Sequence, residues 1–188
     1  MCPDDGSRFT FYVSAELLRA YGALVRSWAP RLDLVSPGDL ERFEERHIGD
    51  SLRAAPLLDQ LAEGPCVDIG SGAGLPGIPL AIVRPERRWT LLEPRKRRAA
   101  FLEEVVRELG LACEVLASTA EEAARDPGLG GAHVLATARA VASAEAVRGL
   151  AEPLLAAGGM TLVFSGRSAE TPADAEEWAP GLTIMRKT

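Results

Sequence analysis

The N-terminal third of the chain carries hydrophobic side chains at helical spacing. From Ser14 to Pro30 they recur every three or four positions, which predicts a helix that Ser14 caps and Pro30 ends. Ser36 followed by Pro37 predicts a second helix start, because proline is favoured at the first helical position. A third helix is expected over residues 47–61. This part of the chain is therefore predicted to be entirely helical.

Beyond residue 62 short apolar strands alternate with helices, which is typical of a parallel sheet covered on both faces. The expected strands are Cys66–Ile69, Trp89–Leu92, Cys113–Ala117, His133–Ala138, Met160–Phe164 and, at a sheet edge, Thr183–Lys187. The expected helices are Gly77–Val83, Lys96–Leu109, Ala120–Arg125 and Ser143–Ala156, the last stopped by Gly158 and Gly159. We therefore predict an α/β protein: a Rossmann-like core over residues 63–188, one compact unit, with an N-terminal helical cap over residues 1–62.

A glycine-rich loop directly follows the first expected strand. It reads Asp68-Ile69-Gly70-Ser71-Gly72-Ala73-Gly74. Glycines at alternate positions let the backbone turn sharply and leave no Cβ between the main chain and a ligand. Because ligands of open α/β sheets bind beyond the carboxyl ends of the strands, this loop is the candidate cofactor site.

The cofactor can be argued from the residues around the loop. Gly72–Gly77 also satisfies the GxGxxG pattern of dinucleotide sites, in which a helix N-terminus meets a pyrophosphate. Asp68, however, would repel a pyrophosphate and attract the cationic amino-acid end of a sulfonium cofactor, and Pro76 and Pro79 remove N–H donors. Glu93 ends the second strand and fits the ribose of either cofactor. These features favour an S-adenosylmethionine-dependent methyltransferase, with an NAD-dependent oxidoreductase as the alternative.

Charge is unevenly distributed along the chain. The net charge of −6 and the pI of about 5.1 argue against bulk nucleic-acid binding. From Arg84 to Arg98, however, seven basic residues face two acids. Such a stretch either meets a polyanion at one place or carries ordinary solvated arginines.

Cysteine use and hydropathy bear on location. The N-terminus has no apolar stretch typical of a signal peptide, and no apolar run approaches the roughly 18 residues needed to cross a bilayer. Of three cysteines, Cys66 and Cys113 lie in strand-like runs, which indicates buried thiols in a reducing compartment. We expect a cytoplasmic protein. Because no Cys/His cluster has metal spacing, we expect no metal.

The amino-acid sequence of the loop indicates a particular family within the methyltransferases. Asp68 to Ile82 resembles the signature of the RsmG (GidB) family, bacterial methyltransferases that modify N7 of one guanine in small-subunit ribosomal RNA. Further similar stretches are Leu34–Ser36, Arg46–Ser51, Thr90–Glu93, Lys96–Leu102 and Arg139–Ser143. The resemblance covers roughly residues 12–166. It implies a class I methyltransferase fold, S-adenosyl-L-methionine as cofactor, and 16S ribosomal RNA or the 30S particle as partner. Separately, we expect the protein to be a monomer.

The resemblance also implies site residues. The cofactor contacts are Gly70, Gly72, Gly74 and Leu75 in the loop, Glu93 at the ribose, Ala120 and Glu121 beside the adenine, and Arg139 near the methyl donor, in addition to Asp68. Arg139 is also the candidate catalytic residue, which would position donor or substrate; a salt bridge at a strand end is the other interpretation. The candidate RNA contacts are His47, Asp50, Ser51, Arg95, Arg97 and Arg167. His47 and Asp50, three apart on one helical face, could instead be a hydrogen-bonded pair.

Three departures from the family pattern leave alternatives open. Thr119 stands where the family usually has arginine, Ser165 where it usually has lysine, and the part after Gly166 is short. The alternatives are a methyltransferase acting on another substrate and a cofactor-binding chain that no longer catalyses.

The resemblance also implies a simple mechanism. Since guanine N7 has a free lone pair, no essential general base is expected. The target guanine should lie in an open loop or be extruded from a helix.

Overall fold

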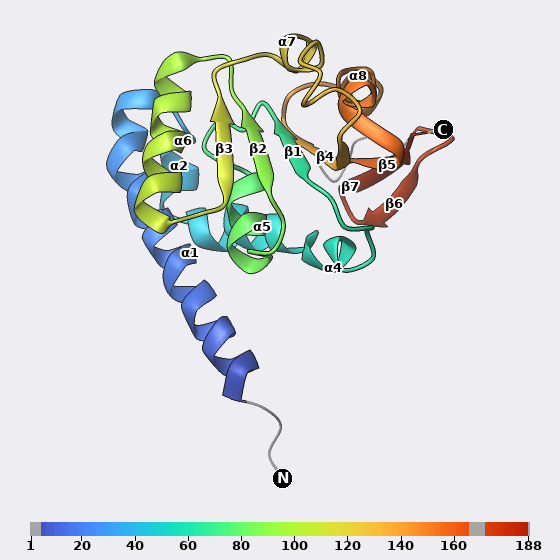
Figure 1. Cartoon of the computed structure of the whole chain (residues 1–188). Helices are drawn as coiled ribbons and strands as arrows, with labels where there is room; N and C mark the ends of the chain where they lie inside the picture. The colour runs from blue at the N-terminus through green and yellow to red at the C-terminus, as the bar shows by residue number, and fades with distance from the viewer. Residues whose placement is uncertain (1–4, 166–171, 188) are drawn as a thin grey trace.

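A computed structural model describes residues 5–165 and 172–187. Its centre is a seven-stranded sheet in the order β3-β2-β1-β4-β5-β7-β6 (Figure 1). The strands are β1 (Cys66–Ile69), β2 (Trp89–Leu92), β3 (Cys113–Leu116), β4 (His133–Arg139), β5 (Leu155–Phe164), β6 (Glu176–Ala179) and β7 (Leu182–Arg186). Strands β1 to β5 run parallel, and β7 is inserted antiparallel between β5 and β6. This topology confirms the Rossmann-like α/β prediction.

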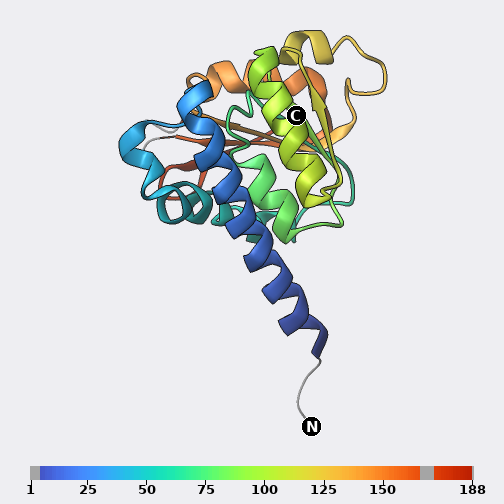
Figure 2. The same cartoon turned by 90° about the vertical axis from the view of Figure 1, so that its left-hand side faces the viewer.

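Helices cover both faces of the sheet. One face packs against α1 (Asp5–Leu32), α5 (Gly77–Val83) and α6 (Lys96–Leu109), and the other against α7 (Ala120–Ala123) and α8 (Ala144–Ala151). Because side chains alternate along a strand, Cys66 of β1 joins the first hydrophobic cluster and Val67 the second. Figures 1 and 2 both show the start of α1 extending beyond the body of the molecule.

The N-terminal segment is helical, but its boundaries differ from the predicted ones. Helix α1 begins at Asp5, so Ser14 lies inside it and its hydroxyl instead approaches the Ile82 carbonyl at 3.5 Å. Pro30 lies within the last turn of α1, where the hydrogen bond that it cannot donate is one of the last before the helix ends at Leu32. Ser36 does cap the next helix, α2 (Pro37–Leu40).

The helix predicted over residues 47–61 is divided. The pieces are η1, a π-helix (Glu44–Ile48), α3 (Gly49–Leu52) and α4 (Ala55–Leu58). Pro56 lacks the N–H that would bond the Leu52 carbonyl, so the helix is interrupted and restarts. Residues 44–53, which comprise η1, α3 and Arg53, lie near the end of β4, where Asp50 and His47 contact Arg139.

The C-terminal part also differs from the prediction. Helix α8 ends at Ala151 and is followed by the 3₁₀ turn η2 (Glu152–Leu154), because Pro153 cannot donate the next helical hydrogen bond. Gly158 and Gly159 therefore lie inside β5 rather than stopping a helix. The predicted edge strand at residues 183–187 is β7, which has β6 outside it, so both strands of the last hairpin are present.

The helical segment and the sheet share one hydrophobic cluster. Tyr21, Val25 and Phe43 are fully buried in the same cluster as Ile78 and Phe101. The division at residue 62, with a helical cap on a methyltransferase core, therefore stays a prediction, since residues on both sides of this position pack in one hydrophobic cluster.

The structure also describes the cysteines, the hydropathy of the helices and the arrangement of possible metal ligands. Burial raises the pKa of the thiols of both Cys66 and Cys113 to about 12, although Cys113 is only partly buried. Among the helices of the described residues, none combines the length and apolar character that crossing a bilayer requires. Within the same residues, no group of three or more His, Cys, Asp and Glu side chains is arranged to hold a metal ion.

Candidate cofactor and acceptor site

Predicted cofactor residues from four strands line up along the carboxyl edge of the sheet. Strands β1 and β4 are neighbours, yet the chain leaves β1 toward β2 and returns from β3 to β4, and in open α/β sheets the ligand crevice lies at such a switch in strand order. Ala120 follows β3, Glu93 follows β2, Gly70 follows β1 and Arg139 ends β4. Since neighbouring strands lie about 4.8 Å apart, these four positions form a row of about 15 Å along the edge.

The glycine loop has a conformation that side chains would disturb. Gly70, Gly72 and Gly74 have φ values of 68°, 56° and 98°, in the left-handed region that favours glycine. The Tyr21 hydroxyl donates a hydrogen bond of 2.9 Å to the Ala73 carbonyl, which ties the loop to α1. The loop is therefore held by a hydrogen bond from α1, and Gly74 packs against the core side chains of Ile78 and Leu102.

Asp68 lies beneath this loop rather than on its surface. Its side chain is fully buried; Oδ1 accepts a hydrogen bond of 2.7 Å from the Thr137 hydroxyl, and Oδ2 accepts one of 3.4 Å from the Gly77 N–H. Burial raises the pKa of Asp68 from its ordinary value of 3.8 to about 6, against the opposing effect of the hydrogen bonds. The carboxyl thus holds β1, β4 and the start of α5 together, and a direct contact with a cofactor stays a prediction.

The raised pKa gives a testable pH dependence. Between about pH 4 and pH 6 the folded protein keeps a proton on Asp68 that the unfolded chain has released, so the free energy of unfolding falls as pH rises. Asp68→Asn removes this contribution. We expect the variant to gain stability relative to the original protein from about pH 4 to pH 7, by up to about 3 kcal/mol, in urea unfolding.

The exposed Asp126 supplies the control, as Asp126→Asn. It should not show the gain seen for the buried site. A constant difference between Asp68→Asn and the original protein over the whole range would mean that Asp68 is already ionised at the acidic end.

Glu93 is held by backbone N–H groups at the end of β2. Its Oε2 accepts a hydrogen bond of 3.0 Å from Gly72, and its Oε1 accepts one of 2.9 Å from Arg95. Each carboxylate oxygen has a second lone pair, so the group can still accept from two hydroxyls. Glu93 is 4% exposed, which fixes its orientation. This geometry fits the vicinal diol of a ribose.

The position after β3 is a helix start. Thr119 and Glu122 form a capping box: the Thr119 Oγ1 accepts from the Glu122 N–H at 3.2 Å, and the Glu122 carboxylate accepts from the Thr119 N–H at 3.0 Å. Ala120 is buried and Glu121 is exposed. The departure at Thr119 therefore has a structural use, which is to begin α7.

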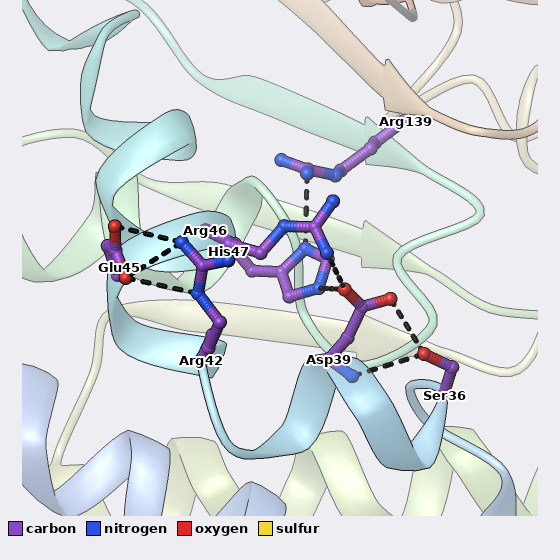
Figure 3. A network of polar contacts seen from close by, with 7 residues as sticks. All are labelled: Ser36, Asp39, Arg42, Glu45, Arg46, His47 and Arg139. Carbon is purple, nitrogen blue, oxygen red and sulfur yellow. Dashed lines mark hydrogen bonds and ion pairs between the residues drawn. The ribbon is translucent and has the colours of Figure 1, made fainter.

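Arg139 extends from β4 toward the N-terminal segment (Figure 3). Its guanidinium donates to Asp50 Oδ2 at 2.8 Å and to His47 Nδ1 at 3.1 Å, and its Cζ lies 5.7 Å from the centre of the Phe164 ring. A guanidinium has donors but no acceptor, so the His47 ring accepts with Nδ1 and is neutral. Burial, and then the charge of Arg139, lower the pKa of His47 accordingly.

A cavity of about 570 Å³ opens beside Arg139. It lies within the size range of small-molecule sites. Its lining residues come from three parts of the chain: Glu45, Arg46, His47, Gly49, Asp50 and Arg53 from the N-terminal segment, Arg139 and Ser165 from the ends of β4 and β5, and Pro180 from the last hairpin. Arg53 connects two of these parts, because it donates to Asp50 Oδ1 at 2.7 Å and to the Pro180 carbonyl at 2.7 Å.

Ser51, Arg95 and Arg97, three further predicted RNA contacts, are not among the residues that line this cavity. Ser51 is fully buried and donates to the His47 carbonyl at 2.7 Å. Arg95 and Arg97 lie at the start of α6, where they line a separate basic hollow of about 320 Å³. Arg167 lies outside the described residues. For all six residues a role toward RNA stays a prediction.

Sequence reasoning missed several residues of this site. Arg53 follows Asp50 at i+3 on the same helical turn, which is a spacing that could have identified it. Phe164 ends the strand beside β4, and Tyr21 reaches the loop from a distant helix; neither gives a local signal. Val141, 40% exposed, lies against Gly70, where an added Cβ would be 2.9 Å from its Cγ2.

Comparison with known proteins shows the family of this chain. The family model GidB, rRNA small subunit methyltransferase G, matches residues 14–183. Relatives named ribosomal RNA small subunit methyltransferase G include one from Acidiphilium cryptum, 45% identical over 86% of this chain and 73% of its own length. Another, from Corynebacterium jeikeium, is 42% identical over 94% of this chain and 79% of its own length.

Solved structures support the fold alone, because their sequence identities are low. A Corynebacterium glutamicum protein has a TM-score of 0.61 at 17% identity and covers 90% of each chain. A 16S rRNA N2 methyltransferase of Thermus thermophilus, in complex with AdoMet and guanosine, has a TM-score of 0.55 at 15% identity and covers 82% of this chain and 44% of its own. The extent of the family match is decisive: this chain belongs to the GidB family, rRNA small subunit methyltransferase G.

Proposed function

We propose that this protein transfers a methyl group from S-adenosyl-L-methionine to N7 of a guanine in 16S ribosomal RNA. Membership of the GidB family supports the activity. The observation that carries it in this chain is the row of Ala120, Glu93, Gly70 and Arg139 along the carboxyl edge of the sheet. Ala120 and Glu121 would lie beside the adenine, Glu93 would hold the ribose, and the glycine loop with Arg139 would hold the methyl-donor end.

The residues present fit that cofactor. Glu93 offers a fixed carboxylate with spare lone pairs, and Gly70 and Gly72 leave the backbone bare where the methionyl part would lie. When bound, S-adenosylmethionine supplies an electrophilic methyl on a positively charged sulfur. The carboxylates of Asp68 and Glu93 add negative charge near the crevice, which favours such a cation.

The catalytic contribution of the chain is placement of the acceptor. Guanine N7 carries a free lone pair, so no side chain has to remove a proton before the methyl is transferred. Holding N7 in line with the methyl group turns the reaction into an effectively intramolecular step. Arg139, at the end of β4, lies on the acceptor side of the glycine loop and positions donor or base.

RNA binding requires cations on a protein with a net charge of −6. The hollow at the start of α6 provides them: its lining residues are Arg31, Leu32, Asp33, Arg95, Lys96, Arg97 and Arg98, five cations and one acid. We assign phosphate contacts to this surface. We further propose that the protein acts in the cytoplasm as a monomer.

The decisive experiment is methyl transfer to 30S particles from a strain that lacks this activity. With methyl-labelled cofactor, we expect label in 16S RNA at one guanine, mapped as N7-methylguanine by cleavage at the modified base. Particles from the parent strain, already modified, are the control and should take no label.

Two other outcomes would reject the proposal. Binding of S-adenosylhomocysteine without transfer to particles or RNA would identify a cofactor-binding protein that no longer catalyses, the alternative suggested by Thr119 and Ser165. Transfer to free metabolites or proteins instead of RNA would identify a methyltransferase of another substrate class.

A further inference from the structure

Asp50 is a carboxylate held between two guanidinium groups. Arg53 donates to its Oδ1 at 2.7 Å and Arg139 to its Oδ2 at 2.8 Å. The Asp50 side chain is nevertheless 30% exposed and lines the cavity of about 570 Å³. Because each oxygen is used once, each keeps a lone pair for a further donor. The carboxylate is thus charged, fixed in direction and open to the cavity.

Arg139 presents the complementary group beside it. Two of its N–H groups are used, one toward Asp50 and one toward His47, which leaves others to donate. Phe164 lies 5.7 Å from the guanidinium carbon and restricts its movement. A fixed acceptor and a fixed donor therefore lie side by side on the wall of one cavity.

This acceptor–donor pair matches one edge of guanine. Along its Watson–Crick edge, guanine presents the O6 acceptor followed by two donors, N1–H and the 2-amino group. A guanidinium can donate to O6 while a carboxylate accepts from N1–H and the amino group. N7 lies beyond O6 on the other edge, so a base held in this way keeps N7 free. Adenine presents a donor at position 6 and an acceptor at N1, the reverse order.

The position of the pair relative to the methyl donor agrees with this use. Arg139 ends β4, which pairs with β1, and the glycine loop follows β1 directly. We propose that Asp50, held by Arg53 and Arg139, reads N1–H and the 2-amino group of the target guanine and is the residue that selects guanine. This inference rests on the proposed function and names the specificity determinant of the same site.

Inosine separates base reading from a structural ion pair. It has the same N7 and O6 as guanosine but lacks the 2-amino group. The mapped target guanosine in the RNA is replaced by inosine, in whichever form of RNA the unaltered protein methylates. We expect kcat/KM of the unaltered protein to fall about 10- to 100-fold, the effect of one hydrogen bond to a charged group.

Asp50→Asn completes the test. The amide replaces a carboxylate oxygen by an NH₂ donor, so we expect kcat/KM on guanosine to fall about 10- to 100-fold and the guanosine-to-inosine ratio to approach one. Binding of S-adenosylhomocysteine, measured by calorimetry, should be unchanged. The matched control is Asp59→Asn, which also breaks an aspartate–arginine pair of 2.7 Å, with Arg84, and should keep the original ratio.

Equal rates of the unaltered protein on guanosine and inosine would overturn the inference while leaving the proposed function intact. So would an Asp50→Asn protein that still discriminates between the two bases. If the unaltered protein methylates neither RNA, the proposed function itself fails. Since the first comparison needs no variant, a folding defect of Asp50→Asn would not prevent a decision.

Discussion

Replacing Glu93 by alanine is expected to weaken the binding of S-adenosylhomocysteine about 100-fold. The carboxylate is fixed by the N–H groups of Gly72 and Arg95 and, in the proposed site, would accept from both ribose hydroxyls. Two charge-assisted hydrogen bonds contribute about 3 kcal/mol together, which corresponds to about two orders of magnitude in Kd. Glu93→Ala also removes the partner of the Gly72 N–H, so the loop loses part of its support. Isothermal calorimetry measures the effect.

The control for Glu93 is Glu114→Ala, an exposed glutamate on the neighbouring strand β3. This variant should bind the ligand like the original protein. Binding by Glu93→Ala within about threefold of the original would mean that the carboxylate supports only the backbone and that the ribose lies elsewhere.

Gly74→Ala should cause a large loss of stability. Gly74 has a φ of 98°, and an added Cβ would lie 2.6 Å from Ile78 Cγ1 and 3.2 Å from Leu102 Cδ2, both in fully buried side chains. Backbone strain and overpacking together should lower the free energy of unfolding by about 3 kcal/mol. For a chain of this length we expect the Tm to fall by about 6–12 °C, measured by calorimetry.

The same substitution elsewhere gives the opposite expectation. Gly149 lies in α8 and has no heavy atom within 4 Å of an added Cβ. Gly149→Ala should raise stability by about 0.5–1 kcal/mol, because alanine loses less backbone entropy in a helix. If the Gly74→Ala protein had the same Tm as the Gly149→Ala protein, the argument from close packing would be contradicted.

The sequence predicted best those elements whose signals are local. The bounds of β1, β2, α5 and α6 are as expected, because each combines an apolar period with a clear stop such as Gly110, which has a φ of 62°. Residues 44–58 were predicted less well. Their hydrophobic spacing is helical, but the missing N–H of Pro56 divides the helix. Hydrophobic spacing alone does not reveal the loss of one backbone hydrogen bond.

The site shows the same limit. Asp50 and Arg139 could each be selected from the sequence, but their contact joins positions 89 residues apart and no local pattern contains it. Asp68 was expected to attract the cationic end of the cofactor, but its burial beneath the loop, where it accepts hydrogen bonds from β4 and α5, could not be predicted. Sequence thus identified which chemical groups are present, while their exposure depends on packing between distant elements.

The walls of the crevice come from separate stretches of chain. The glycine loop and Glu93 belong to connections of the parallel sheet, whereas Asp50 and Arg53 belong to the short segment that Pro56 interrupts. Arg139, at the end of β4, connects the two by donating hydrogen bonds to Asp50 and His47. If Asp50 selects the base as proposed, substitutions in residues 44–53 should alter which nucleotide is accepted while the donor side keeps its shape. In an enzyme built in this way, substrate specificity can evolve while the cofactor-binding part is kept.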